Sequence, residues 1–181
     1  MVTITIDDTE VENLKIAKLI KKYGLETRTI FFADFKIFNA KEIIKKESDM
    51  GFTIGSHTLT HYGLCELPEP LLKIELKHSK EEIEKLTGKP CKWFAYPYGQ
   101  YNDKVVKMVE KVGYKYARTC KKVDNGNFEL GSFGLNGKNF ERSKKSELNI
   151  CHIHYYNLED SGNWDRFENF LKWLKDSEDL K

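Results

Sequence analysis

Short apolar runs alternate with amphipathic segments along most of this chain. The runs Val2–Ile6 and Thr27–Phe32 are rich in β-branched and aromatic residues, which is typical of buried strands. Between them, Val11–Tyr23 repeats its apolar residues with a helical period, and Gly24 follows as a residue that ends helices. The pattern therefore predicts strands and helices in regular succession.

The same succession continues toward the C-terminus. Further strands are predicted at Phe52–Gly55, Lys92–Ala95, Tyr114–Arg118 and Leu148–Tyr155, with shorter ones near Phe128–Leu130 and Ser132–Leu135. Further helices are predicted at Ala40–Ser48, from Pro68 and Pro70 through Leu86, at Asp103–Val112 and at Trp164–Lys175. Strands that alternate with helices indicate an α/β fold with a parallel sheet inside and helices outside. About seven strands favour an incomplete barrel over an open sheet, and the absence of a repeat or linker predicts a single domain over residues 1–181.

The charges of the sequence nearly balance. Its 181 residues include 30 Lys and Arg and 28 Asp and Glu, which give a formal net charge of +2. This balance argues against a dedicated nucleic-acid or membrane-surface binder, and no apolar stretch is long enough to predict a membrane-spanning helix. The four cysteines are widely spaced, so a cysteine-ligated zinc site is not expected. Because the chain enters a strand at once, we expect a cytoplasmic protein, or a secreted one if a leader was trimmed.

Two histidines four residues apart form the first candidate site. His57 and His61 share one face if the segment between them is a helical turn, and two imidazoles placed in this way can bind one divalent metal. Asp7 and Asp8 follow the first predicted strand, so one carboxylate can join the metal while the other stays free as a base. The plainer alternatives are a solvated turn for the histidines and a helix cap for one of the aspartates.

Four segments, taken in chain order, carry a resemblance to a known family. They are Thr5-Ile6-Asp7-Asp8, His57-Thr58-Leu59-Thr60-His61, Phe94-Ala95-Tyr96-Pro97-Tyr98-Gly99 and Ile153-His154. Together they resemble the polysaccharide deacetylases of the NodB-homology group, carbohydrate esterase family four, whose motifs are TFDDG, H(S/T)xxH, RxPYG and a late Leu-His. The resemblance spans nearly the whole chain. It implies a distorted, incomplete (β/α)7 barrel and metal-dependent removal of acetyl groups from N-acetylated or O-acetylated sugars.

The resemblance also implies a metal centre with a base beside it. Asp8, His57 and His61 are similar to the family's metal ligands, and the implied cofactor is a divalent metal, namely zinc with cobalt or nickel as alternatives. Asp7 is similar to the catalytic base, which takes a proton from water.

The other matched residues are expected to act on the substrate. Tyr98 is similar to the residue whose backbone N–H binds the oxyanion. His154 matches the catalytic acid, and His152, which shares its face of the predicted strand, is the alternative. Candidates for contact with the sugar are Trp93, Tyr96, Pro97 and Tyr98.

Three departures separate this chain from the family pattern. Ala95 stands where many members have an arginine that pairs with the catalytic aspartate, and Arg118 and Arg142 are possible replacements from other strands. Thr9 replaces the usual glycine of the first motif. The tryptophan-containing fourth motif is not visible between residues 113 and 135.

The sequence leaves three functions open. The first is a metal-dependent deacetylase that acts on an acetylated sugar or glycan, with no nucleic-acid partner. The second is a related amidase that acts on a C–N bond outside carbohydrates, which the loss of the family arginine keeps open. The third is a catalytically weak carbohydrate-binding barrel. The oligomeric state is not predicted.

Overall fold

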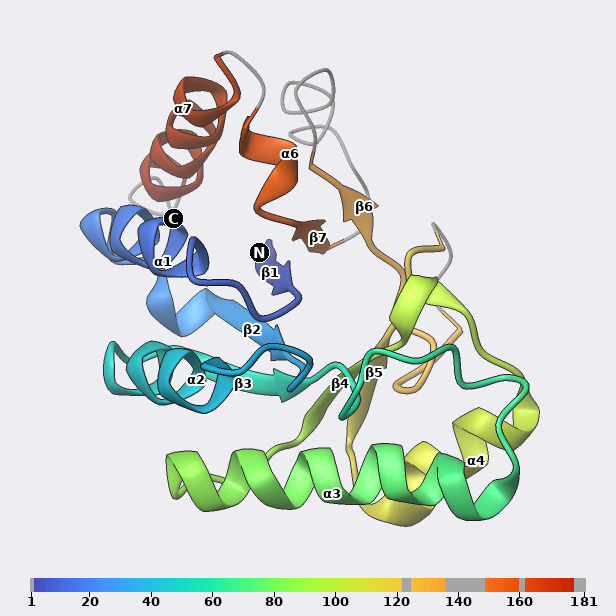
Figure 1. The fold of residues 1–181 in the computed structure, drawn as a ribbon. Helices are drawn as coiled ribbons and strands as arrows, with labels where there is room; N and C mark the ends of the chain where they lie inside the picture. The colour runs from blue at the N-terminus through green and yellow to red at the C-terminus, as the bar shows by residue number, and fades with distance from the viewer. Residues whose placement is uncertain (1, 122–124, 136–148, 160–161, 178–181) are drawn as a thin grey trace.

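The computed structural model describes residues 2–121, 125–135, 149–159 and 162–177. In this part of the chain, seven strands form one curled sheet in the order β5-β4-β3-β2-β1-β7-β6, and each pairing is parallel. The strands are β1 (Thr3–Asp7), β2 (Thr29–Ala33), β3 (Thr53–Ser56), β4 (Trp93–Ala95), β5 (Tyr116–Arg118), β6 (Phe133–Gly134) and β7 (Ile150–Ile153). The sheet is a half-barrel with helices outside, which confirms the predicted incomplete (β/α)7 barrel (Figure 1).

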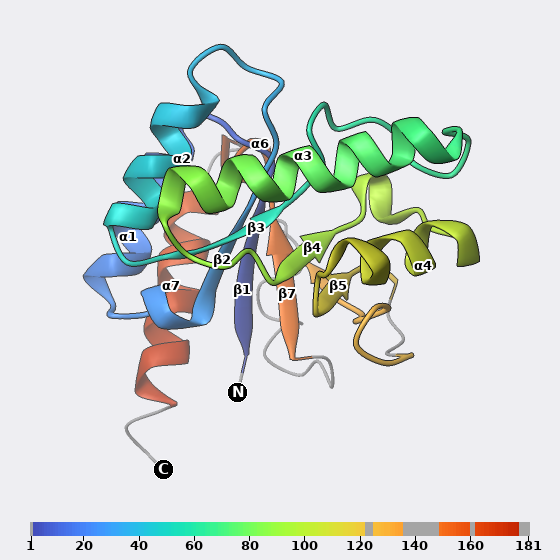
Figure 2. The same ribbon diagram turned by 90° about the horizontal axis from the view of Figure 1, so that it is seen from below.

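The helices cover the outer face of this sheet (Figures 1 and 2). They are α1 (Asn13–Lys22), α2 (Ala40–Asp49), α3 (Glu69–Thr87), α4 (Asp103–Val112), α6 (Tyr156–Glu159) and α7 (Asn163–Asp176), with 3-10 turns η1 (Glu26–Arg28) and η2 (Pro97–Gly99). The chain returns after β7 so that α7 lies beside α1, where Lys22 and Tyr23 both donate hydrogen bonds to Glu168. Within the described ranges, no helix has the length and apolar character needed to cross a membrane.

Local sequence signals set the ends of the two helices that cover β3, β4 and β5. The Asn102 side chain accepts a hydrogen bond from the Val105 N–H at 3.0 Å and caps α4, as the sequence predicts. Gly88 and Gly113 end α3 and α4 with φ angles of 68° and 100°, a conformation that glycine adopts without strain. One short predicted strand is absent, because in residues 128–130 only Leu130 forms an isolated bridge.

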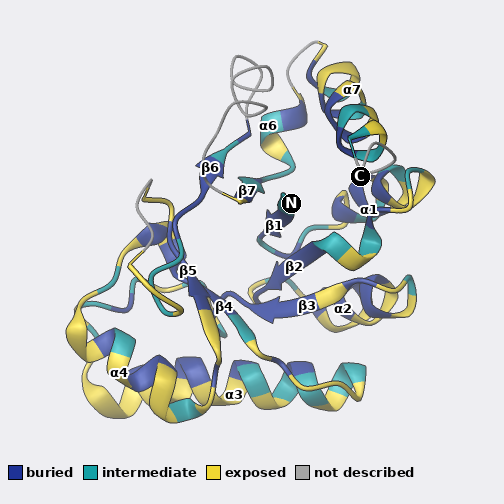
Figure 3. Ribbon diagram, turned by 180° about the vertical axis from the view of Figure 1, so that it is seen from behind, coloured by how far each residue is buried: buried dark blue, intermediate teal, exposed yellow. Residues whose placement is uncertain are grey.

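Alternation along the strands divides their side chains between two faces. Ile4 and Ile6 of β1 belong to the large apolar cluster under the helices. On the concave face, Ile30, Phe32 and Ala95 form a separate small cluster. Figure 3 shows that the strands themselves are largely buried, while exposed residues lie on the outer sides of the helices. Polar residues stand at the carboxyl edge of the sheet, where Asp7, Ser56 and Arg118 end β1, β3 and β5.

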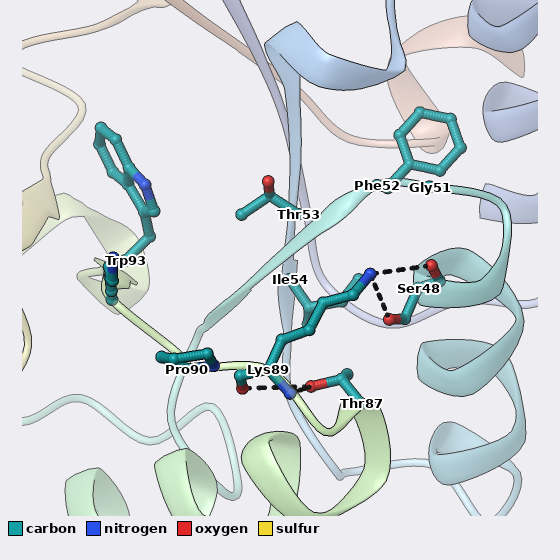
Figure 4. Close-up of a pocket in the computed structure, with 10 residues that line it drawn as sticks. Ser48, Gly51, Phe52, Thr53, Ile54, Thr87, Lys89, Pro90 and Trp93 are labelled. Carbon is teal, nitrogen blue, oxygen red and sulfur yellow. Dashed lines mark hydrogen bonds between the residues drawn. The ribbon is translucent and has the colours of Figure 1, made fainter.

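A groove lies at the opposite edge, where β3 and β4 begin (Figure 4). There the Lys89 ammonium donates hydrogen bonds to the carbonyl and hydroxyl oxygens of Ser48, both at 3.4 Å. Trp93 lines this groove as the first residue of β4, and its ring stacks on Tyr116 with 4.5 Å between centroids. The structure therefore corrects the expectation that Trp93 floors a sugar site beside the histidines, since it lies at the other edge of the sheet.

Candidate active site

A loop, and not a helical turn, brings the two histidines together. The backbone φ angles are 73° at Thr58 and 59° at His61, which excludes an α-helix between His57 and His61. The sequence prediction of a helical turn was therefore wrong. The two imidazoles nevertheless meet edge to face, with 4.7 Å between their ring centroids.

Asp8 adds a carboxylate to this pair. Its Oδ1 atom lies 3.2 Å from His61 Nε2 and 3.9 Å from His57 Nε2, and one ligand atom from each residue lies within 4.8 Å of the others. The Nδ1–H of His57 donates to the Ala95 carbonyl at 2.8 Å, which leaves its Nε2 lone pair free. Within the described residues, the buried Asp8 Oδ1 accepts no hydrogen bond of good geometry. Two imidazole nitrogens and one such oxygen fit a divalent cation with open positions.

The backbone conformation at Asp8 explains why the side chains of two neighbouring aspartates have different partners. Asp7 is the last residue of β1, whereas Asp8 has a φ of 67° and turns out of the strand. The Asn13 side chain at the start of α1 donates a hydrogen bond to the Asp8 carbonyl at 2.7 Å. This bond holds Asp8 in a conformation that a residue other than glycine seldom adopts.

Lys36 places a cation beside the same carboxylate. Its Nζ atom lies 3.1 Å from Asp8 Oδ1 and 3.4 Å from Asp34 Oδ2. Burial by itself lowers the pKa of Lys36, but the charges of Asp34 and Asp8 outweigh burial and raise it, so the side chain stays charged. The sequence analysis did not identify Lys36. The signal that could have found it is its position just after β2, the strand that pairs with β1.

Asp7 forms a buried ion pair with Arg118. The guanidinium crosses the concave face from β5 to Asp7 Oδ1, and its side chain is fully buried over the ring of Phe32. Burial by itself raises the pKa of Asp7, but Arg118, followed by the neighbouring histidines, holds this pKa well below its usual range. Ala95 and Arg118 are register partners on β4 and β5, so Arg118 supplies the cation that Ala95 lacks. Arg142, the other candidate, lies outside the described residues.

His152 in β7 and His154 directly after it both lie near Asp7 but differ in their surroundings. The Ser132 hydroxyl donates to the Thr119 carbonyl at 2.8 Å, so it accepts from Nδ1–H of His152, also at 2.8 Å. Burial, followed by the charge of Arg118, lowers the pKa of His152 to about 4, so this ring is neutral near pH 7. The Nε2 atom of His154 lies 3.8 Å from Asp7 Oδ2, and its ring is partly exposed.

The Pro97–Gly99 turn presents Tyr98 to the histidines. Tyr98 has a φ of 57° and an exposed side chain, and its ring lies edge to face against His61 at 4.9 Å between centroids. Gly99 has a φ of 65°, and a Cβ atom there would lie 2.9 Å from Cys120 Cβ, so the turn requires glycine. Among the described residues, none accepts a hydrogen bond from the Tyr98 N–H.

Tyr96 faces away from this turn. It is fully buried in the helix-covered cluster, and its hydroxyl donates to the Phe128 carbonyl at 2.9 Å. The structure therefore corrects the expectation that Tyr96 contacts a sugar, because alternation along β4 directs it to the opposite face from Ala95. Pro97 is also buried and shapes the turn.

Comparison with known proteins identifies the family. A family model described as polysaccharide deacetylase matches residues 1–117. The chain belongs to the polysaccharide deacetylase family. The match includes the aspartate pair, both histidines of the loop and the Tyr98 turn, and it ends one residue before Arg118.

This chain also resembles curated proteins of Bacillus subtilis (strain 168). It is 32% identical over 123 residues to the putative polysaccharide deacetylase YxkH, which covers 65% of the chain and 44% of that relative. It is 29% identical over 102 residues to the peptidoglycan-N-acetylmuramic acid deacetylase PdaA, which covers 56% of the chain and 38% of PdaA. The chain thus spans less than half the length of these curated relatives.

Solved structures share the fold of this chain at low sequence identity. The Bc1960 peptidoglycan N-acetylglucosamine deacetylase superposes with a TM-score of 0.77 at 19% identity, over 98% of this chain and 82% of that one. Bacillus subtilis PdaA gives a TM-score of 0.72 at 21% identity, over 97% and 75%. A mutant of BA3943, a pseudoenzyme of carbohydrate esterase family four with restored activity, gives 0.76 at 20% identity, over 98% and 63%. These likenesses establish the half-barrel fold.

Proposed function

We propose that this chain is a metal-dependent deacetylase that removes acetyl groups from N-acetylated sugars or glycans. The observation that carries the proposal is the convergence of Asp7, Asp8, His57, His61 and His154 at one edge of the sheet. His154 Nε2 lies 3.8 Å from Asp7 Oδ2 and 4.0 Å from Asp8 Oδ2, so all five groups surround one small volume.

Asp7 is the proposed base. Its ion pair with Arg118 keeps the carboxylate ionised throughout the working pH range, so it can always accept a proton. The same pairing makes it a weak base, since a low pKa reduces the driving force for proton abstraction. A divalent cation held by Asp8, His57 and His61 would supply Lewis acidity toward the acetyl carbonyl and lower the pKa of water at the site. A weak base and a cation site are therefore complementary.

His154 is the proposed acid and Tyr98 the proposed oxyanion donor. His152 is neutral near pH 7 and its Nδ1–H is committed to Ser132, which favours His154 as the proton donor to the departing amine. Among the described residues the Tyr98 N–H has no acceptor, and the Tyr98 ring lies against His61, which supports this N–H as the donor to the oxygen that gains negative charge.

Exposed aromatic rings on the surrounding loops support a sugar substrate. Phe38, Tyr62, Tyr98 and Tyr156 follow β2, β3, β4 and β7, and each is more than half exposed. Such rings offer apolar faces to the CH groups of a sugar, with hydroxyl groups at the tyrosine edges. PdaA and Bc1960 are named as deacetylases of N-acetylated peptidoglycan sugars, so we propose an N-acetylhexosamine unit as the substrate of this chain.

The test is acetate release from N-acetylglucosamine oligomers and peptidoglycan fragments. Metal-stripped protein is assayed alone and after addition of zinc, cobalt or nickel. We expect turnover only with metal, and Asp7→Asn is expected to retain metal while losing most turnover. His78→Ala, which changes an exposed histidine of α3, is the matched control for histidine substitutions.

A binding protein without turnover is the second candidate, because a structural neighbour is a pseudoenzyme. Stoichiometric metal together with no acetate from any acetylated sugar would favour that function over the deacetylase.

A further inference from the structure

The loop that carries His57 and His61 is strained and lacks regular structure. Thr58 and His61 both have positive φ angles, 73° and 59°. This conformation is unfavourable for residues other than glycine, and especially for a β-branched residue such as Thr58. A strained loop keeps one shape only when contacts from the surrounding structure fix it.

Glu75 of α3 provides such contacts at the middle of the loop. Its Oε2 atom accepts hydrogen bonds from the backbone N–H groups of Leu59 and Thr60, both at 2.9 Å. Its Oε1 atom accepts a third bond from the Thr60 hydroxyl at 2.8 Å. Hydrogen bonds to a charged acceptor are stronger than those between neutral groups, so both carboxylate oxygens hold the loop firmly.

Other contacts also hold this loop. The Phe35 N–H donates to the Leu59 carbonyl at 2.9 Å, and the Thr58 hydroxyl accepts from the His61 N–H at 2.9 Å. From the described part of the chain, Glu75 is the one side chain outside the loop with a hydrogen bond to Leu59 or Thr60. It is 9% exposed, which limits competition from water.

We propose that Glu75 is a positioning residue that preorganises the metal site by fixing the loop between His57 and His61. Without it, the loop must be ordered when a cation binds, and that conformational entropy is subtracted from the binding free energy. The inference rests on the proposed function only in that the two histidines bind a metal.

The test compares zinc affinities of metal-stripped variants by competition with a chromophoric chelator. We expect Glu75→Ala and Glu75→Asp to weaken zinc binding about 10- to 100-fold, the usual effect of removing a group that orients metal ligands. Glu75→Gln should stay near wild type, because its amide oxygen can accept both N–H bonds while its NH₂ group donates to the Thr60 hydroxyl. The matched control is Glu81→Ala, which removes an exposed carboxylate of the same helix, 3.4 Å from Lys77 Nζ.

Wild-type zinc affinity in Glu75→Ala or Glu75→Asp overturns the proposal, as does a loss of thermal stability with unchanged affinity. If Glu75→Ala does not fold, Glu75→Asp decides, because it keeps the charge but withdraws both oxygens by one methylene. His57→Ala separates the two proposals. If His57→Ala binds zinc with wild-type affinity, the proposed metal site is wrong. If His57→Ala loses zinc binding but Glu75→Asp does not, only the proposed role of Glu75 is wrong.

Discussion

Among single residues, Asp7 and Arg118 show most clearly what a sequence can and cannot specify. Ala95 leaves the family's cation missing, and the sequence offers two arginines as replacements. The register of β4 against β5, which pairs Ala95 with Arg118, brings Arg118 to Asp7. Register depends on tertiary packing, so the replacement was predicted as a pair of candidates and not as one residue.

Arg118→Ala should destabilise the protein at neutral pH. It leaves the Asp7 carboxylate buried without its partner, which typically costs about 3–5 kcal/mol of unfolding free energy. In the wild type, the lowered pKa of Asp7 contributes stability that is present above pH 3.8 and is lost below it. In the variant, burial raises the pKa of Asp7 instead. The loss of unfolding free energy relative to the wild type should therefore be smaller at pH 4.5 than at pH 7. Urea unfolding at the two pH values measures this change.

A double variant checks the cause of this effect. Asp7→Asn combined with Arg118→Ala removes the buried charge, so it should be less destabilised at pH 7 than Arg118→Ala alone. Equal destabilisation of the two would mean that Arg118 acts by packing on Phe32 and not by pairing.

His154→Ala and His152→Ala should separate the roles of His152 in β7 and His154 directly after it. Loss of a general acid typically lowers turnover by about 10²–10⁴-fold, and we expect this in His154→Ala with zinc binding retained. His152→Ala should have a much smaller effect on turnover, because its ring is neutral and bonded to Ser132. Steady-state kinetics with matched zinc content measures both. The reverse ranking would transfer the acid role to His152.

Among the elements, the longer helices were predicted well and the loop between His57 and His61 was not. The ends of α3 and α4 follow from Asn102, Gly88 and Gly113, because capping depends on neighbours in sequence. The conformation of the loop between the histidines depends instead on Glu75 of α3, which accepts three hydrogen bonds from that loop. The residues around His57 and His61 give no signal for hydrogen bonds to a distant helix. The spacing of the two histidines was therefore interpreted as helical.

A buried acid in α2 provides a test at this scale. Glu47 is 1% exposed, its Oε1 atom has no hydrogen-bond partner among the described residues, and burial raises its pKa well above the usual 4.5. Stability should therefore fall as the pH rises above 4.5, where the unfolded chain ionises and the folded chain resists ionisation. Glu47→Gln has no ionisable group at this position, so its unfolding free energy should not show this fall with pH. The variant should be more stable than the wild type by roughly 1–3 kcal/mol at pH 8, with little gain at pH 4.

Denaturant unfolding of both proteins at pH 4 and pH 8 gives the comparison. Glu42→Gln, an exposed change in the same helix, should alter the unfolding free energy little, since its pair with Lys46 is solvated. A gain from Glu47→Gln of the same size at both pH values would contradict the account.

For the whole molecule, metal binding should raise the free energy of unfolding. A ligand that binds only the folded state, at a free concentration 100 times its Kd, adds about 2.7 kcal/mol to the unfolding free energy. Zinc should therefore raise the unfolding midpoint of the wild type and of His78→Ala, but not that of His57→Ala. Thermal unfolding with zinc, and again after chelation, measures the effect. An equal rise in all three proteins would place the zinc outside the proposed centre.

The position of β1 in the sheet has a consequence for how the protein is made. β1 lies between β2 and β7, and the Thr5 hydroxyl donates to the Cys151 carbonyl across 146 positions of sequence. On the ribosome, one edge of β1 must therefore stay unpaired until β7, about 146 positions later in the sequence, has emerged. An unpaired strand edge attracts other chains, so the nascent protein has a long interval in which aggregation competes with folding. Asp7 and His154 therefore come together only when β7 docks against β1.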